Sequence, residues 1–175
     1  MRVDVWDTVF IRARRRDVHP FLGGVEAYPT WWPGLIVEPV ADGVYRMRHA
    51  PRTRFASRHE ITAHVLKERP DKGMVFSYRG DLSGKAEFFY LDEVDGVAVH
   101  YVLAAELDGR GWRGRLGDHR ASVRRALNHL KDLLEQGRLP GTEPDPGLLA
   151  HQAQAAAELL PSGGTHRTDL IREQS

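Results

Sequence analysis

The sequence predicts a domain of the α+β class, in which a curved antiparallel sheet is closed by one long C-terminal helix. Between residues 35 and 105 the apolar residues follow a two-residue period, and short turns separate the segments. Consecutive strands joined by tight turns form an antiparallel meander. From residue 115 to 137 the apolar residues instead lie three and four positions apart, which is the spacing of one helix face. A lone amphipathic helix must bury its apolar side, so we expect it to pack on the sheet.

The elements before the helix are expected in a simple order. A first strand is expected at residues 3–11, where valines alternate with polar residues. Two short helices follow at residues 15–22 and 25–32, and Gly or Pro-Gly pairs end them. The remaining strands, for about seven in all, are expected at residues 35–40, 44–49, 55–66, 74–78, 85–91 and 97–105.

The C-terminal helix is expected to have one apolar and one wet face. Its apolar stripe consists of Leu116, Val123, Leu127, Leu130 and Leu134. The opposite face, expected in solvent, carries Arg125, Asn128, Lys131, Asp132 and Glu135. Gly137 is the expected helix stop. At ~1.5 Å per residue the helix is about 34 Å long, and a sheet that curls around it leaves space for a ligand between them.

Length and composition exclude several classes of protein. We expect one domain at residues 1–138, followed by a Pro-rich linker and tail at 139–175 with a short helix near 148–160. That tail is expected to dock on the domain, dock on a second subunit as a homodimer, or remain mobile. The net charge of +1 gives no reason to expect a nucleic-acid partner, and the lack of cysteine excludes disulfides. Without a signal peptide or a long apolar run, we expect a cytoplasmic protein without stable membrane insertion.

Two motif-like stretches are interpreted as structural. Residues 109–114 match the pattern G-x-G-x-x-G, but no second parallel strand follows, so a strand-to-helix loop is expected and no cofactor. His59, Glu60 and His64 resemble a zinc motif with one residue too many. On a strand, positions 59 and 64 point to opposite faces, so no metal site is expected.

Several segments together resemble the SRPBCC superfamily, which includes START, Bet v 1-like and polyketide cyclase/dehydrase proteins. They are residues 28–34 (YPTWWPG), 76–84 (FSYRGDLSG), 95–97 (DGV) and 127–135 (LNHLKDLLE). The resemblance covers residues 3–138 and implies the helix-grip fold. It also implies a deep, largely apolar cavity for a hydrophobic molecule. It implies no particular chemistry, because the superfamily has no shared set of catalytic residues.

Candidate ligand-binding residues are those that strand alternation, the helix stripe or the resemblance directs toward this cavity. They are Val9, Trp31, Trp32, Phe55, Ser57, His59, Phe76, Tyr78, Phe88, Tyr90, Val99, Tyr101, Leu116, Val123 and Leu127. Alternation alone does not decide whether Phe76 and Tyr78 or Val75 and Ser77 face inward.

Asp7, His59 and Tyr101 are candidate catalytic residues. A carboxylate, an imidazole and a phenol in one cavity can perform general acid–base work on a polyketide-like carbonyl. The alternative is that Asp7 and His59 lie hydrated or hydrogen-bonded near strand ends, and that the tyrosines only line the cavity and have no chemical role. The functions that stay open are binding of a lipid or polyketide-like molecule, a polyketide cyclase or dehydratase, and a partner-binding module with a filled core.

Overall fold

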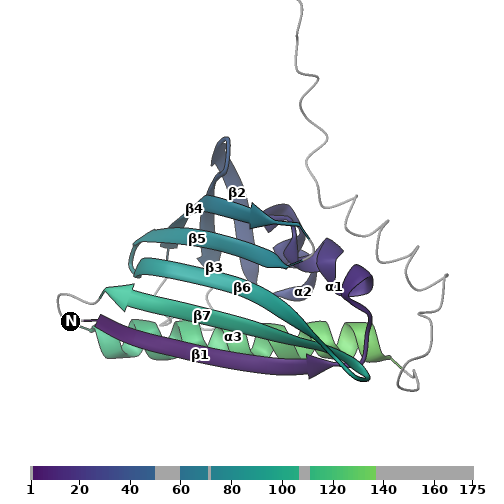
Figure 1. The fold of residues 1–175 in the computed structure, drawn as a ribbon. Coiled ribbons are helices and arrows are strands. Elements are labelled where there is room, and N and C mark those ends of the chain that lie inside the picture. The colour runs from purple at the N-terminus through teal and green to yellow at the C-terminus, as the bar shows by residue number, and fades with distance from the viewer. Residues whose placement is uncertain (1, 50–59, 71, 107–110, 137–175) are drawn as a thin grey trace, which may run out of the picture.

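The computed structural model describes residues 2–49, 60–70, 72–106 and 111–136 (Figure 1). Seven strands, two α-helices and a 3-10 turn precede one long helix. Their order is β1 (Arg2–Ile11), α1 (Arg15–Leu22), the 3-10 turn Val25–Ala27, α2 (Tyr28–Trp31), β2 (Leu35–Ala41), β3 (Val44–His49), β4 (Glu60–Arg69), β5 (Gly73–Gly80), β6 (Ser83–Glu93), β7 (Gly96–Glu106) and α3 (Trp112–Glu135).

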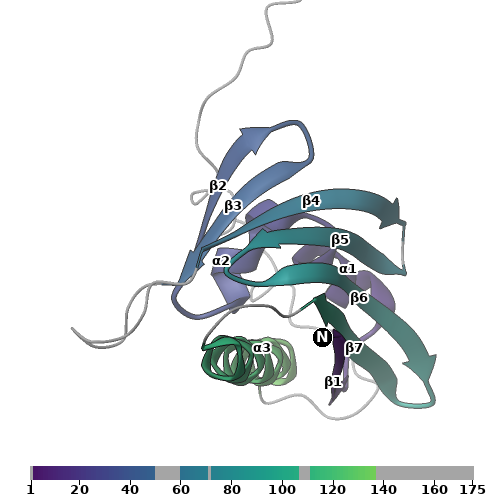
Figure 2. The same cartoon turned by 90° about the vertical axis from the view of Figure 1, so that its left-hand side faces the viewer.

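The strands form one antiparallel sheet in the order β1-β7-β6-β5-β4-β3-β2. All neighbours are consecutive in sequence except β1, which pairs with β7 from Arg2–Glu106 to Ile11–Val97. The sheet curves, and α3 runs alongside β1 on the inner side of that curve (Figures 1 and 2). This arrangement confirms the predicted α+β class and the helix-grip order of elements.

The core lies between the inner face of the sheet and the helices. In β1 the alternate residues Val5, Asp7, Val9 and Ile11 are buried, as a strand with one covered face requires. All five residues of the predicted α3 stripe are buried as well. Phe76 and Tyr78 belong to the continuous apolar core, whereas Val75 is buried outside that core and Ser77 is half-buried, so Phe76 and Tyr78 are the pair that faces inward.

The second short helix is present as predicted, but it is divided into two parts. A 3-10 turn covers Val25–Ala27, and a single α-helical turn covers Tyr28–Trp31. Pro29 occupies the start of α2, and it has no N–H to donate to the carbonyl of Val25. One uninterrupted helix through residues 25–32 would need that hydrogen bond.

The start of α3 also differs from the prediction. The helix begins at Trp112, after Gly111, whose φ of 82° lies in the left-handed region that glycine adopts without strain. Residues 112–114 of the G-x-G-x-x-G stretch are therefore helical rather than loop, while residues 109 and 110 fall outside the described part of the chain. The expected stop at Gly137 and the tail at 139–175 also fall outside it.

Strand β4 runs further than predicted, to Arg69, because residues 67–69 pair with the start of β5. The predicted residues 55–59 of that strand lie outside the described residues. The expectation of a fully solvated outer face on α3 is wrong at two positions. Lys131 donates from Nζ to the carbonyl of Phe10 at 2.8 Å, and Glu135 accepts from the backbone N–H of Arg12 at 2.7 Å. These residues meet the backbone at and just after the end of β1 because α3 lies along that strand.

Candidate functional site

Most of the predicted ligand-binding residues share the inner face of the sheet or the facing side of the helices. Phe55, Ser57 and His59 lie outside the described residues, so their predicted role is not tested. The others are all buried in one continuous core: Val9, Trp31, Trp32, Phe76, Tyr78, Phe88, Tyr90, Val99, Tyr101, Leu116, Val123 and Leu127.

Aromatic rings from α2 and from the sheet meet in the middle of this core. Tyr28 and Trp31 belong to α2 and Trp32 directly follows it, and the rings of all three lie within 6.2 Å of that of Phe88. The ring of Phe88 on β6 lies 5.7 Å from that of Tyr28 and 5.8 Å from that of Trp31, in edge-to-face geometry. Phe88 also lies 4.8 Å from Tyr101 on β7, its cross-strand partner. Aromatic pairs in these arrangements add stability beyond the area that they bury.

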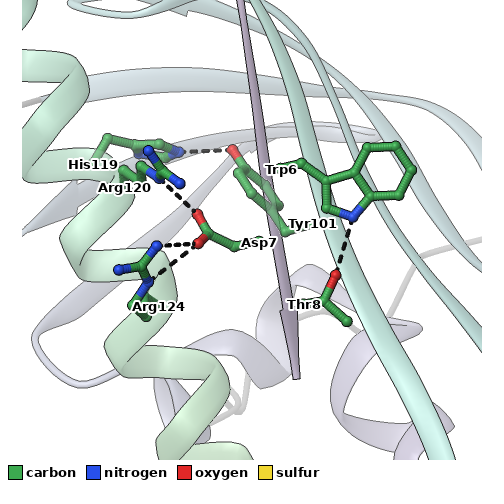
Figure 3. Close-up of polar contacts among 7 residues, drawn as sticks. All are labelled: Trp6, Asp7, Thr8, Tyr101, His119, Arg120 and Arg124. Carbon is green, nitrogen blue, oxygen red and sulfur yellow. Dashed lines mark hydrogen bonds and ion pairs between the residues drawn. The ribbon is translucent and has the colours of Figure 1, made fainter. Parts of the chain in front are cut away.

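A buried polar cluster, consisting of Tyr78, Tyr101 and His119, lies against these rings. The hydroxyl of Tyr101 is hydrogen-bonded to Nε2 of His119 on α3 at 2.7 Å (Figure 3). The imidazole of His119 lies 6.1 Å from the ring of Tyr78 and 6.2 Å from that of Trp32. His119 is only 7% exposed, so the cluster joins sheet to helix with little access to water.

The hydroxyl of Tyr78 differs from that of Tyr101. It is buried, and no hydrogen-bond partner lies within 3.5 Å of it among the described residues, although the Tyr101 hydroxyl is near enough for each phenol to shift the pKa of the other. Burial is the main cause that raises the pKa of each tyrosine above its usual value of 10.0. Both phenols are therefore protonated at neutral pH and can donate a hydrogen bond.

Polar contacts continue from the cluster toward the end of β3. The indole Nε1 of Trp32 donates to Oγ of Ser122 at 2.8 Å. That hydroxyl lies 3.4 Å from Nδ1 of His49, the half-buried last residue of β3. A series of polar groups thus leads from the buried polar cluster toward the end of β3, beside the apolar stripe of α3.

Asp7 lies in the middle of β1, directly opposite Tyr101 in the β1–β7 register. Its carboxylate is buried, 6% exposed, and points toward α3 (Figure 3). One oxygen accepts from Nη2 of Arg124 at 2.8 Å, and the other lies 3.4 Å from Nε of Arg120. Asp7 therefore anchors the helix to the sheet beside the buried polar cluster, and it is not at a strand end.

Tyr90 also faces inward, but at a different place. Its hydroxyl is hydrogen-bonded to Nδ1 of His19, which belongs to α1. It therefore ties α1 to β6, and its ring also meets that of His19 edge-on.

His119 was missed by the sequence analysis, although the sequence carries a signal for it. The stripe on α3 runs from Leu116 to Val123, a gap of seven residues in which one inward position is due at 119 or 120. A histidine that occupies a core position of an otherwise apolar stripe needs a buried hydrogen-bond partner. The partner is Tyr101, which strand alternation already predicts to face the core.

Among the described residues, no group of three or more histidines and acidic residues is close enough to hold a metal ion. In the same part of the chain, no helix has the length and apolar character needed to cross a bilayer.

No protein-family model and no curated protein matches this chain in sequence. Solved structures match it in fold. One is the di-domain ARO/CYC protein StfQ from the steffimycin biosynthetic pathway, with a TM-score of 0.60 and 15% identity. That match covers 78% of this chain and 51% of StfQ, so the chain spans about half the length of the di-domain protein.

Two further structures match over nearly their whole length. DR_A0006 from Deinococcus radiodurans has a TM-score of 0.57 and 16% identity, over 78% of this chain and 100% of its own. The Aha1 dimer from Colwellia psychrerythraea has a TM-score of 0.56 and 15% identity, over 78% of this chain and 99% of its own. At these identities the similarity establishes the helix-grip type of fold and leaves the activity to be argued from the residues.

Proposed function

We propose that the protein binds a small hydrophobic molecule, lipid or polyketide-like, between α3 and the inner face of the sheet. The observation that carries the proposal is the buried polar cluster. The unsatisfied hydroxyl of Tyr78 does not stabilise the apolar core, because burying a hydrogen-bond donor without a partner costs free energy. A few polar groups that converge within an apolar, aromatic surrounding are typical of a site that orients a ligand.

The proposal is supported by the fold shared with StfQ, although that likeness alone says nothing of the ligand. In this proposal the apolar surface is supplied by Trp32, Phe88 and the stripe of α3, and the polar end by Tyr78, Tyr101 and His119. Phe55, Ser57 and His59 keep their predicted place in the site.

The neutral fluorescent probe N-phenyl-1-naphthylamine tests the proposal. We expect saturable binding of one probe per chain with a blue-shifted emission. The inner-face variant Leu127→Gln should weaken this binding at least about tenfold, since it places an amide among apolar groups. The matched outer-face variant Leu91→Gln should leave it unchanged. Absence of saturable binding, or equal effects of the two variants, would refute the proposal.

A second function, polyketide cyclase or dehydratase, is favoured by the Tyr101–His119 hydrogen bond. There Tyr101 would donate its proton to a substrate oxygen and regain one from His119, as a general acid. Asp7 and His59 remain candidate catalytic residues. Because Asp7 pairs with two arginines of α3, an anchoring role fits it better than catalysis. His119→Gln should then abolish turnover of a polyketide-like substrate and leave the affinity for the neutral probe within about threefold. Unchanged turnover would leave binding as the better account.

Two further proposals accompany the binding function. We propose that the protein acts in the cytoplasm, and that its oligomeric state is either monomer or homodimer. The Aha1 neighbour was solved as a dimer. Sedimentation equilibrium of the full chain distinguishes the two states, and localisation follows from fractionation of expressing cells.

A further inference from the structure

We infer that the ligand is an uncharged molecule with a carbonyl or similar oxygen, and that this oxygen accepts a hydrogen bond from the hydroxyl of Tyr78. The inference rests on the proposed function and specifies the chemistry of its ligand. It makes Tyr78 the residue that determines specificity at the polar end of the site.

The first argument concerns the two phenols. Tyr101 is already engaged, because its hydroxyl is bonded to Nε2 of His119 at 2.7 Å. Tyr78 is 2% exposed, and its hydroxyl has no hydrogen-bond partner within the described residues. A buried phenol O–H without an acceptor is rare in folded proteins and requires an explanation. An acceptor oxygen on the ligand supplies the missing partner.

The second argument concerns charge. Among the described residues the buried polar or charged side chains are Asp7, Asp17 and His119. The guanidinium groups of Arg120 and Arg124 on α3 already pair with Asp7. A ligand carboxylate at Tyr78 would lose its hydration, and no arginine or lysine is buried among the described residues to compensate for that loss, which is strongly unfavourable.

Burial makes an anion less favourable still. It is the largest cause that raises the pKa of the Tyr101 phenol, whereas the charge of Asp7, which pairs with two arginines, is the smallest. The same loss of hydration that opposes a phenolate opposes any other negative charge at that place. A neutral oxygen accepts the hydrogen bond from Tyr78 without this penalty.

Three naphthalenes with the same ring system test the inference by isothermal titration calorimetry. They are 2-acetylnaphthalene (a ketone), 2-ethylnaphthalene (a hydrocarbon) and 2-naphthoate (a carboxylate). At pH 7.5 the unmodified chain should bind the ketone about tenfold more tightly than the hydrocarbon, the effect of one net hydrogen bond. It should bind the carboxylate more weakly than the hydrocarbon.

Tyr78→Phe should reduce the affinity for the ketone to within about twofold of that for the hydrocarbon, which should itself be unchanged. Tyr45→Phe is the matched control, because the Tyr45 hydroxyl is bonded to Glu26 and lies outside the cluster. That variant should keep the preference for the ketone. The comparison of ketone with carboxylate uses the unmodified chain, so it remains decisive if a variant does not fold.

The possible results separate the two proposals. If the hydrocarbon binds but the carboxylate binds as tightly as the ketone, or if Tyr78→Phe keeps the ketone preference, the inference is wrong and the proposed function stands. If none of the three naphthalenes binds, the proposed function itself fails, and the inference fails with it.

Discussion

His100 and Tyr101 are neighbours on β7, but they lie on opposite faces of the sheet and in different surroundings. Inside, Tyr101 meets His119 among buried rings. Outside, Nδ1 of His100 lies 2.9 Å from Oγ1 of Thr8, and its ring stacks on Phe89 at 4.7 Å. Both pairs join an imidazole to a hydroxyl beside aromatic rings. What differs is water, which competes for the outer pair and is largely excluded from the inner one.

The same contrast holds for the acidic residues of β1. Asp7 points inward to two arginines, while Asp4 points outward and lies 3.6 Å from Arg2, with both side chains 72% exposed. An exposed ion pair contributes little to stability, whereas a buried carboxylate depends on its partners. The sheet therefore offers variants that compare a buried carboxylate with an exposed one on the same strand.

The largest effect is expected when Asp7 loses both partners. The double variant Arg120→Gln/Arg124→Gln should lower the free energy of unfolding by about 2–3 kcal/mol, because it leaves a buried carboxylate unpaired. This is below the cost for a fully buried pair, since the two arginines are 50% and 61% exposed. Urea unfolding measures the change.

Arg2→Gln is the control, and we expect a change below about 0.5 kcal/mol. The two single variants should sum to clearly less than the double variant, because either arginine alone still pairs with Asp7. Strict additivity would show that the arginines contribute separately, and the account of Asp7 as a shared anchor would be wrong.

A smaller effect is expected at the hydroxyls. Tyr101→Phe removes the partner of His119 Nε2 and should cost about 1–2 kcal/mol, whereas Thr8→Val on the outer face should change stability by less than about 0.5 kcal/mol. Thermal unfolding of both variants makes the comparison. Equal changes would mean that water reaches the inner pair as easily as the outer one.

Tyr78→Phe should differ in sign from Tyr101→Phe. Removal of a buried hydroxyl that has no partner relieves a desolvation cost, so the ligand-free protein should gain up to about 1 kcal/mol. Chemical unfolding without ligand measures the gain. A loss of more than about 1 kcal/mol would show that the hydroxyl of Tyr78 is hydrogen-bonded in solution.

The smallest effect concerns the outer histidine. Partial burial lowers the pKa of His100 from 6.5, and Glu93 opposes this shift. The unfolded chain then binds a proton at a higher pH than the folded one, so the contribution of His100 to stability is complete above about pH 6.5. It is lost as the pH falls from there toward the folded pKa. NMR titration of the imidazole should give a pKa below 6.5, and a higher value would contradict the prediction.

The sequence predicted those parts of the fold that depend on periodicity. One side of β1 and one stripe of α3 had to be buried, and their spacing identified both. Element ends were less accurate, because pairing with a neighbour decides where a strand stops. Strand β4 reaches Arg69 only because β5 lies beside it. The break before α2 follows from Pro29, a local signal that was present and not used.

For the candidate site, alternation identified which side chains face inward but not which of them meet. Tyr101 and Tyr90 lie on the same face, yet their hydroxyls bond to histidines of different helices, His119 and His19. The partner of a buried hydroxyl depends on how α1 and α3 pack, which is a tertiary property. Asp7 likewise faces inward as predicted, but its ion pairs depend on the rotation of α3 about its axis.

The contact between α3 and β1 has a further consequence for how copies of this chain meet. An open sheet has two edge strands whose free backbone groups can pair with another chain and begin aggregation. At one edge, β1, Nζ of Lys131 donates a hydrogen bond to the carbonyl of Phe10 at 2.8 Å. At the other, β2 carries Pro39 and a register irregularity beside it, both of which interrupt a regular ladder. Strand addition is thus hindered at these two positions, which favours contact between copies of the chain through side-chain surfaces.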